Sequence, residues 1–251
     1  MKILLVNNET TKEDLGWIER SVELGLPERT NQIENLAARL REYGEVEIVH
    51  HCDLDPAAVD ADCVFLSGDF APWDANNVDV DYAAEMQLIR EAKQPIFGIC
   101  AGIQIIAAAY GAKIVTMAGG RGEHGFTTMD VVKEHPLTKP FDGKITLFAH
   151  HGEEADRVPE EFDLLASTEL CKVQLIAHKT LPIAAAQLHP ELRTEDYPDG
   201  KALIDAFFAA YVKYVIAPKT PLFERSFFVA TQLLHIRRFL SINCHEIWKR
   251  G

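Results

Sequence analysis

The sequence has few cysteines, and their spacing suits neither a disulfide framework nor a zinc site. Its five cysteines are an odd number scattered along 251 residues, and none forms a Cys-x-x-Cys pair. This spacing excludes a small disulfide-rich scaffold and is typical of a reducing compartment. We therefore expect a cytoplasmic protein.

Long apolar runs are also absent. No stretch approaches the ~20 apolar residues that a membrane-spanning helix needs. The apolar N-terminus, residues 1–6, becomes polar at Asn7 and is too short for the apolar region of a secretory signal. The sequence therefore predicts neither a membrane span nor a cleaved targeting segment.

Basic residues are outnumbered by acidic ones. The chain has 25 Lys and Arg against 38 Asp and Glu, which gives a net charge of -13 at pH 7. So acidic a surface repels phosphate backbones and anionic lipids, and we expect no nucleic-acid or membrane partner. With 47% hydrophobic and 25% charged residues, the composition is that of a globular protein with one large domain, with or without an appendage.

Apolar strands alternate with helices over the first 110 residues. The predicted strands are residues 2–6, 46–50, 63–66 and 95–99. The predicted helices are residues 31–43, which begin with an Asn31–Glu34 capping box, 80–92 and 101–110. This alternation predicts an α/β protein with a doubly wound, mostly parallel sheet.

The pattern changes after Gly111. Short strand-like runs with turn residues between them predict antiparallel additions to the sheet, at residues 113–116, 127–132, 145–149, 164–167, 173–178 and 183–188. A helix over residues 199–216 is expected to close the domain, which we place at residues 1–217.

Residues 218–251 are predicted to form a C-terminal helical extension. Pro218 and Pro221 interrupt the chain, and an apolar helix with a basic cluster follows over residues 223–242. Such a helix must bury one face, against its own domain or against a partner or second copy of the chain. Truncation after Ala217 would lower stability in the first case and abolish association in the second.

A Gly-x-Cys-x-Gly turn, Gly98 to Gly102, stands between a predicted strand and a predicted helix. Its Cys100 occupies the tip of a nucleophile elbow, where the backbone is strained and the side chain faces the N-terminus of the next helix. A helix N-terminus favours the thiolate. A lone buried cysteine is more often a packing residue, so the catalytic interpretation needs a base elsewhere in the chain.

A candidate base follows the last predicted strand, in the segment Gln187-Leu188-His189-Pro190-Glu191. A histidine at the carboxyl end of a strand lies at the edge of a parallel sheet where active sites form. Glu191 could accept the Nδ1 proton of His189 and fix its tautomer. The alternative is a surface histidine beside a solvated glutamate.

Together, the Gly98–Gln104 segment and His189-Pro190-Glu191 resemble the two motifs of class I (triad) glutamine amidotransferases. The resemblance covers about residues 1–213 and implies a flavodoxin-like fold. Within the family, the glutaminase domain of GMP synthetases is the most similar. Three further segments resemble that domain, at residues 121–125 (Arg-Gly-Glu-His-Gly), 149–153 (Ala-His-His-Gly-Glu) and 162–168.

The resemblance implies a role for each catalytic residue. Cys100 would attack the side-chain amide of L-glutamine and form a γ-glutamyl thioester. His189 would be the general base and then the general acid, and Glu191 would orient it. The backbone N–H of Ala101 and the loop at Gly68 and Asp69 would form the oxyanion hole.

Substrate binding is assigned by the same resemblance to Gln104, His151 and Gly152. No cofactor is expected. The adjacent pairs His50-His51 and His150-His151 invite a metal interpretation, but neighbouring residues of a strand point to opposite faces, so we expect no metal site.

The chain departs from the family pattern in two places. Asp69 stands where the family has the second glycine of a Gly-Gly-Pro loop, so the oxyanion hole is expected to be impaired or to be assembled only on partner binding. Residues 8–29 form an insertion after the first strand. It is either decoration or a lid or partner surface.

The expected activity is that of a glutaminase that supplies ammonia to an ATP-dependent synthetase acting in trans, because the chain shows no Gly-rich phosphate loop. One alternative is a stand-alone γ-glutamyl hydrolase. Another is a non-catalytic binding or regulatory module of the same fold. Ammonia release from glutamine, compared with cleavage of γ-glutamyl amides, separates the first two.

Overall fold

The computed structural model describes residues 1–70, 77–120 and 122–212. The centre of this part of the chain is a nine-stranded sheet. Its strands are β1 (Lys2–Asn7), β2 (Glu45–His50), β3 (Cys63–Leu66), β4 (Ile96–Ile99), β6 (Glu123–Val131), β7 (Lys144–His151), β9 (Phe162–Ser167), β10 (Leu175–His178) and β11 (Ile183–Ala186).

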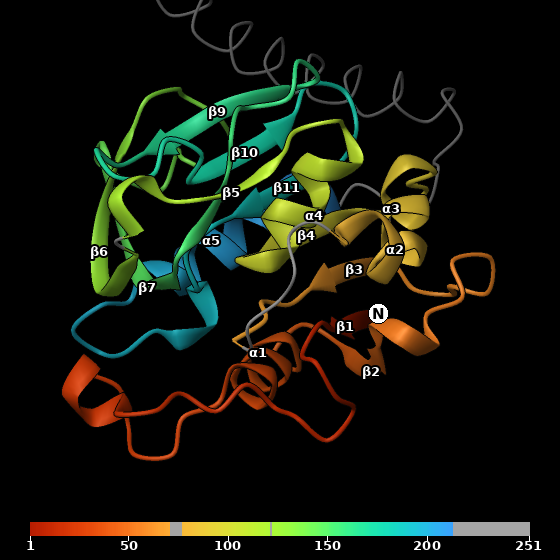
Figure 1. Cartoon of the computed structure of the whole chain (residues 1–251), viewed down its shortest axis with the longest axis horizontal. Coiled ribbons are helices and arrows are strands. Elements are labelled where there is room, and N and C mark those ends of the chain that lie inside the picture. Colours follow the sequence, from red (N-terminus) through yellow and green to blue (C-terminus); the bar gives the residue numbers. More distant parts are fainter. Residues whose placement is uncertain (71–76, 121, 213–251) are drawn as a thin grey trace, which may run out of the picture. The chain divides into compact units, whose positions relative to one another are not determined.

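The strands lie in the order β2-β1-β3-β4-β11-β10-β9-β6-β7 (Figure 1). Neighbours from β2 to β11 are parallel, and every pairing from β11 to β7 is antiparallel. The predicted doubly wound sheet with antiparallel additions is thereby confirmed. Two of the predicted antiparallel additions differ. β5 (Ile114–Thr116) pairs with β8 (Glu153–Ala155) in a separate two-stranded sheet, and β11 is antiparallel to β10 but parallel to β4.

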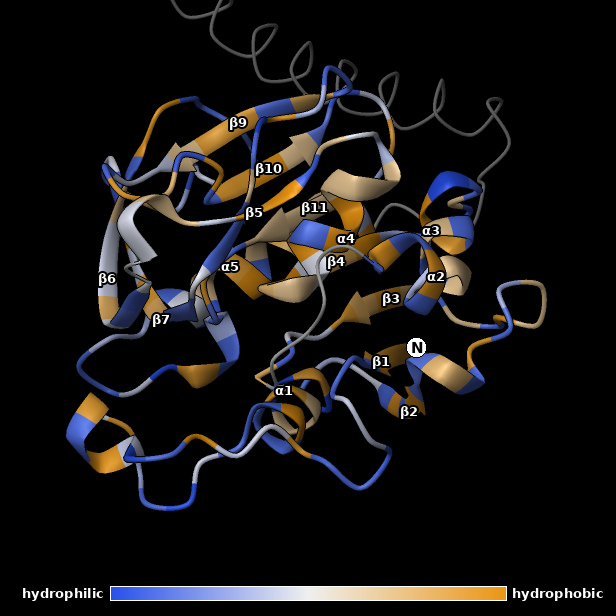
Figure 2. Ribbon diagram, viewed as in Figure 1, coloured by the Kyte–Doolittle hydropathy of each residue, from blue (hydrophilic) through white to orange (hydrophobic). Residues whose placement is uncertain are grey.

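Helices cover both faces of the large sheet. Because side chains alternate along a strand, Ile3 and Leu5 of β1 pack with α1 (Gln32–Leu40) and α5 (Asp199–Phe207). Their neighbours Leu4 and Val6 pack instead with α3 (Ala83–Arg90) and α4 (Ala101–Ala109). Burial on both faces explains the apolar sequence of β1, β3 and β4, and Figure 2 shows β1 and β3 mostly in orange.

Two predicted helices differ in detail. The helix expected over residues 80–92 is divided into α2 (Val78–Asp81) and α3 at Tyr82, whose backbone leaves the helical region at φ -113°. The Tyr82 hydroxyl lies 3.4 Å from the carbonyl of Asn8 and from Oδ2 of Asp69. The closing helix α5 continues as a π-helical turn, Phe208–Val212, and the rest of its expected length lies outside the described residues.

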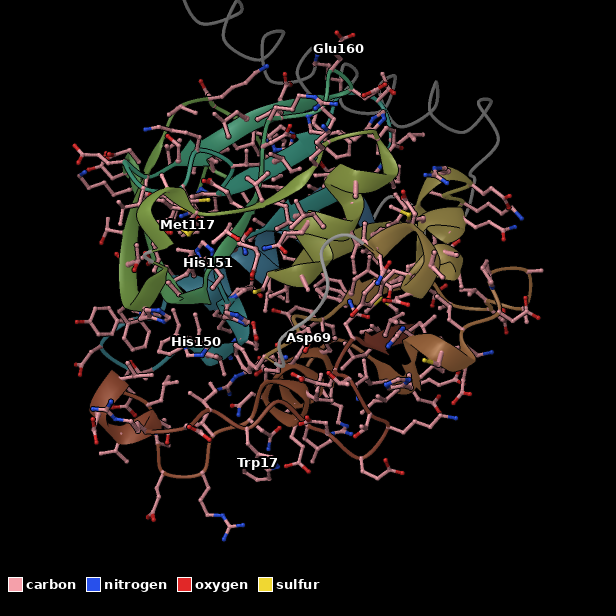
Figure 3. All side chains as sticks on the ribbon, viewed as in Figure 1. Trp17, Asp69, Met117, His150, His151 and Glu160 are labelled. Carbon is pink, nitrogen blue, oxygen red and sulfur yellow. The ribbon has the colours of Figure 1, made fainter. Side chains whose placement is uncertain are left out.

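The insertion at residues 8–29 is mostly irregular, and its one helical element is a short 3₁₀ turn, Ser21–Leu24. Its Ile18 and Leu26 pack on Phe148 of β7 and on Leu192. The segment runs beneath the β6–β7 hairpin (Figure 1), and Trp17 projects from it nearly half exposed (Figure 3). The insertion therefore borders the end of the sheet where β7 terminates.

The predicted extension at residues 218–251 lies outside the described residues, as do Ala71 and Pro72 of the loop after β3. Among the helices of the described ranges, none is long and apolar enough to cross a membrane.

Candidate active site

The carboxyl ends of three neighbouring parallel strands define the site. β3 ends before Gly68 and Asp69, β4 ends before Cys100, and β11 ends shortly before His189. Since β3 pairs with β4 and β4 pairs with β11, three segments far apart in the sequence meet at one sheet edge.

Cys100 occupies a strained turn between β4 and α4. Its φ of 52° and ψ of -107° lie outside the regions that L-residues normally adopt, and its N–H donates to the carbonyl of Ala186 at 2.9 Å. The turn requires close backbone packing, because a Cβ on Gly98 would lie 2.7 Å from the carbonyl of Gly102. Strain at a buried cysteine that caps a helix is the geometry expected of a nucleophile elbow.

His189 and Glu191 form a fully buried pair. Nδ1 of His189 lies 2.7 Å from Oε1 of Glu191, and both side chains have zero exposure. The N–H of His189 donates to the carbonyl of Phe148 in β7 at 2.7 Å, and Pro190 starts a 3₁₀ turn that brings Glu191 back toward the ring. His189 is therefore not a surface histidine beside a solvated glutamate, which was the alternative interpretation.

Charge raises the pKa of His189. Burial by itself lowers this pKa, but the charges of Glu191 and Cys100 outweigh burial and raise it to about 10. Nε2 has no hydrogen-bond partner of regular geometry among the described residues, as is common in catalytic groups without substrate. A Cβ on Gly68 would lie 3.0 Å from Cε1 of His189 and 3.1 Å from Cβ of Cys100, so His189 and Cys100 both border Gly68.

The residues predicted for the oxyanion hole flank Cys100. Ala101 begins α4, where first-turn N–H groups have no partner within the helix. Among the described residues other than glycine, positive φ occurs at Arg20, Arg29 and Cys100. Asp69 is not among them, so its aspartate side chain imposes no left-handed strain on the loop after β3.

A buried glutamate of the insertion holds that loop. The N–H of Phe70 lies 3.3 Å from each carboxyl oxygen of Glu9, which also accepts a hydrogen bond from Gln32. Burial raises the pKa of Glu9 to about 8, the Gln32 hydrogen bond opposes the rise, and the charges of Asp69 and Asp14 add to it. The raised pKa reduces the negative charge that Glu9 places beside the loop after β3.

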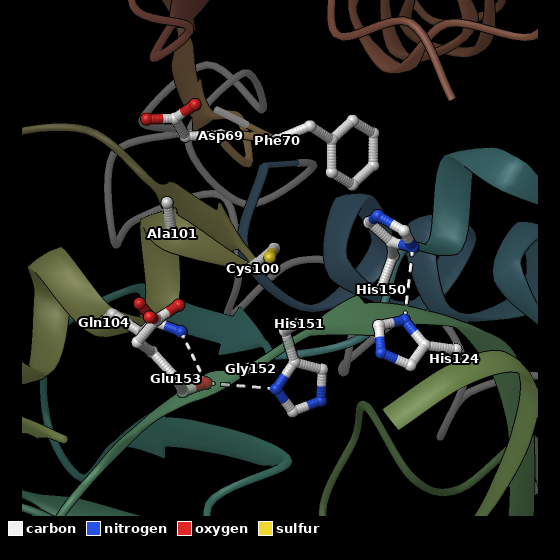
Figure 4. A pocket seen from close by; sticks show the side chains of 10 residues that line it. All are labelled: Asp69, Phe70, Cys100, Ala101, Gln104, His124, His150, His151, Gly152 and Glu153. Carbon is white, nitrogen blue, oxygen red and sulfur yellow. Dashed lines mark hydrogen bonds between the residues drawn. The ribbon is translucent and has the colours of Figure 1, made fainter. Parts of the chain in front are cut away.

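A cavity of 220 Å³ opens around Cys100 (Figure 4). Figure 4 shows Asp69 and Phe70 on one side of the sulfur and Gln104, Glu153 and His151 on the other. The lining residues are Asp69, Phe70, Cys100, Ala101, Gln104, His124, His150, His151, Gly152 and Glu153. All three residues predicted to bind substrate, Gln104, His151 and Gly152, thus lie in its wall.

The side chains of Gln104 and His151 brace this wall. Nε2 of Gln104 donates to the carbonyl of Glu153 at 2.9 Å, and Nδ1 of His151 lies 3.0 Å from the same oxygen. Nε2 of His151 lies 3.0 Å from Oε2 of Glu123, so neither ring nitrogen is free to serve Cys100 as a base. Gly152 leaves its part of the wall open, since a Cβ there would meet nothing within 4 Å.

Several site residues have no role in the sequence-based assignment. Phe70 packs against the rings of His189 and His150, with centroids 5.0 Å away in each case. Burial, helped by the charges of His189, His124 and His151, lowers the pKa of His150 to about 4. Gln187 is fully buried and places Nε2 3.7 Å from Sγ of Cys100. Its position directly after β11 and two residues before His189 was a usable signal.

Two groups of possible metal ligands occur among the described residues. In the first, His50 ends β2 and a turn follows, so the rings of His50 and His51 lie 4.4 Å apart beside Cys52, and the opposite-face argument does not hold for this pair. Both nitrogens of His50 already contact backbone groups, the carbonyl of Glu9 and the N–H of Cys52.

The second group is Glu123, His151 and Cys171, all buried. The Glu123 carboxylate there already receives hydrogen bonds from Thr168 and Gln174 in addition to the contact with His151. Because its acceptor sites are taken, the group is built as a hydrogen-bond network.

The fold agrees with what comparison with known proteins shows. The family model "Glutamine amidotransferase class-I" matches residues 30–210. The chain therefore belongs to the class I glutamine amidotransferases, a family of enzymes.

Individual relatives share one description, that of a glutamine-hydrolysing GMP synthase subunit. The relative from Thermoplasma acidophilum is 33% identical over 180 residues, 70% of this chain and 85% of the relative. The corresponding protein of Methanocaldococcus jannaschii is 40% identical over 109 residues, and this match spans 42% of the chain and only 55% of the relative. The crystal structure of a protein from T. acidophilum superposes with a TM-score of 0.68 at 29% identity, covering 85% of this chain and 95% of that one.

Proposed function

We propose that the chain hydrolyses L-glutamine with Cys100, His189 and Glu191 and releases ammonia for a separate synthetase subunit. The observation that supports this most directly is the strained Cys100 at the end of β4 beside the buried His189–Glu191 pair at the end of β11. A nucleophile, a base and a group that orients the base are what acyl transfer from an amide requires.

In the proposed reaction, the Cys100 thiolate attacks the Cδ carbonyl carbon of glutamine, and the C–N bond breaks once His189 has given a proton to the amide nitrogen. Ammonia leaves and a γ-glutamyl thioester remains. His189 then removes a proton from water, which attacks the thioester and releases glutamate and the Cys100 thiolate. The raised pKa of His189 suits the first half, because the ring starts as the imidazolium that donates.

The remaining contacts with substrate follow from the cavity wall. Gln104 lines the cavity. Its Oε1 is buried and has no hydrogen-bond partner among the described residues. An unpaired buried acceptor is costly, and an α-ammonium group would satisfy it. The N–H groups of Ala101 and of the Gly68–Asp69 loop would face the oxyanion of the tetrahedral intermediate.

The partner is inferred from the relatives. Proteins described as one subunit of a glutamine-hydrolysing GMP synthase imply a second subunit that consumes the ammonia, and we propose an ATP-dependent synthetase of this kind as the partner in trans. The binding site for the acceptor of the ammonia would then lie on that partner.

The decisive experiment measures ammonia release from glutamine by the purified chain, with acid-quenched samples searched by mass spectrometry for a γ-glutamyl adduct on the peptide that contains Cys100. Turnover with an adduct on Cys100 supports the proposal. An inert protein that forms no adduct would favour the non-catalytic module.

A second candidate substrate is a larger γ-glutamyl amide. A neighbouring cavity of 530 Å³ shares Phe70, His124 and His150 with the cavity at Cys100, and Trp17 and Leu24 of the insertion help to line it. This space could receive a bulky leaving group. Faster cleavage of γ-glutamyl amides than of glutamine would identify the chain as a γ-glutamyl hydrolase.

A further inference from the structure

A chain of buried amides connects the nucleophile to the opposite wall of the cavity. It begins at the carbonyl oxygen of Glu153, which accepts from Nε2 of Gln104 at 2.9 Å. The same Nε2 donates to Oε1 of Gln187 at 3.2 Å, and Nε2 of Gln187 donates to Sγ of Cys100 at 3.7 Å. Gln104 is almost fully buried and Gln187 is fully buried, and the two contacts that Gln187 makes are both buried.

The direction of every bond in this chain follows from its first member. A backbone carbonyl can only accept a hydrogen bond, so the Gln104 atom that faces Glu153 must be the amide nitrogen. That nitrogen also faces Gln187, which must present its oxygen to avoid a contact between two donors. The Gln187 nitrogen is then left facing the sulfur, and the amide cannot be reversed without breaking the chain.

From this geometry we propose that Gln187 is a further catalytic residue, whose side-chain N–H stabilises the Cys100 thiolate, and that Gln104 is the positioning residue that orients it. A donor aimed at sulfur favours the anion over the thiol, because hydrogen bonds to ionised acceptors are the stronger ones. The same N–H serves the thiolate again when it leaves the thioester. This inference rests on the proposed role of Cys100 as nucleophile.

Two substitutions at Gln187 separate a donor from a packing residue. Gln187→Glu keeps the size and the acceptor for Gln104 but turns an oxygen toward the sulfur. Gln187→Leu removes the donor without adding charge. If Gln187 only packs, the isosteric Gln187→Glu should disturb Cys100 less than Gln187→Leu does. If Gln187 donates to the thiolate, Gln187→Glu should disturb Cys100 more, because it places an oxygen against the sulfur.

Two further variants complete the set. Gln104→Leu removes the group that orients Gln187 and leaves the Gln187 amide in place. Gln174→Leu is the matched control, since Gln174 is an equally buried glutamine whose Nε2 donates to Glu123 and not to the sulfur.

The measurement is the rate of alkylation of Cys100 by iodoacetamide as a function of pH, followed on the Cys100 peptide by mass spectrometry, with exposed Cys52 as internal reference. We expect the midpoint of the Cys100 profile to rise by about one pH unit in Gln187→Leu, a tenfold loss of thiolate below the midpoint. It should rise further in Gln187→Glu, by less in Gln104→Leu, and stay unchanged in Gln174→Leu.

Unchanged midpoints in folded Gln187→Leu and Gln187→Glu would overturn the proposal, as would an equal shift in Gln174→Leu. If Gln187→Glu does not fold, the test uses the other three variants. A higher Cys100 midpoint in Gln187→Leu and Gln104→Leu, with no change in Gln174→Leu, supports the proposal, and unchanged midpoints overturn it. The assay reads the thiol without turnover. A chain that shows the shifts but releases no ammonia would therefore support stabilisation of the Cys100 thiolate by Gln187 and refute the proposed function, and with it a catalytic role for Gln187.

Discussion

Nδ1 of His189 and Oε1 of Glu191 lie 2.7 Å apart with no exposed surface on either side chain. Removing one member of such a buried pair destabilises the fold, because the remaining group stays buried without its partner. The arrangement also fixes the ring so that Nε2 is the nitrogen left for Cys100.

Replacement of the two residues should therefore have unequal effects. Glu191→Gln keeps an acceptor for Nδ1 and should retain roughly 10–100 times more glutaminase turnover than His189→Ala, which removes the proton carrier itself. Steady-state kcat for both variants is the measurement. Near-normal turnover in His189→Ala would disprove the assignment of the base, and His151 could not easily replace it because both of its nitrogens face acceptors.

Labelling should single out Cys100 among the cysteines. A glutamine-like alkylating agent should modify Cys100 and spare Cys63 and Cys171, since burial raises the pKa of Cys63 to about 12 and makes the thiol of Cys171 still harder to ionise. Cys100→Ala and Cys100→Ser should lower turnover by roughly 10⁴-fold or more with the fold intact. Peptide mapping after labelling gives the distribution, and even labelling of all cysteines would count against a special thiolate.

The strained backbone at Cys100 should show itself in stability. Glycine adopts a φ of 52° without strain, so Cys100→Gly should be more stable than Cys100→Ala by about 1 kcal/mol, although glycine normally destabilises relative to alanine. Urea denaturation of both variants measures the difference. Ala108→Gly within α4 is the control and should cost about 1 kcal/mol.

Glu9 should matter for turnover although it belongs to the insertion. Glu9→Ala removes the acceptor for the N–H of Phe70 and loosens the loop that carries Gly68 and Asp69, and we expect kcat to fall about tenfold. Glu9→Gln keeps an acceptor and should stay close to the parent enzyme. If both variants were fully active, the loop after β3 would have no need of this anchor.

Glu85 should make stability depend on pH. Its carboxyl is fully buried, burial raises its pKa to about 8, and a hydrogen bond from Asn8 partly opposes the rise. The folded protein thus holds a proton that the unfolded chain releases near pH 4.5, and this residue lowers the free energy of unfolding as the pH rises from about 4.5 to 8.

Glu85→Gln should remove that penalty. We expect the variant to gain on the order of 3 kcal/mol at pH 8 and little at pH 4.5. Chemical denaturation at both pH values measures the gain, with the exposed Glu160→Gln as a control that should not change it. An equal effect of Glu85→Gln at both pH values would contradict the assigned protonation.

Local patterns were enough to predict the frame of the site. Gly98 and Gly102 around Cys100 predict a tight turn, and His189 directly after an apolar run predicts a position at the carboxyl end of a strand. These inferences need only chain periodicity and backbone sterics, which act between residues close in sequence.

The alternation of strands and helices, the elbow at Cys100 and the position of His189 after a strand could be read from the amino-acid sequence, because each depends on short-range geometry. The anchoring of Phe70 by Glu9, the contact of His151 with Glu123 and the donor that Gln187 points at the sulfur became visible only in the folded chain. A buried polar group must find a partner, and which partner it finds depends on which strands become neighbours across the sheet.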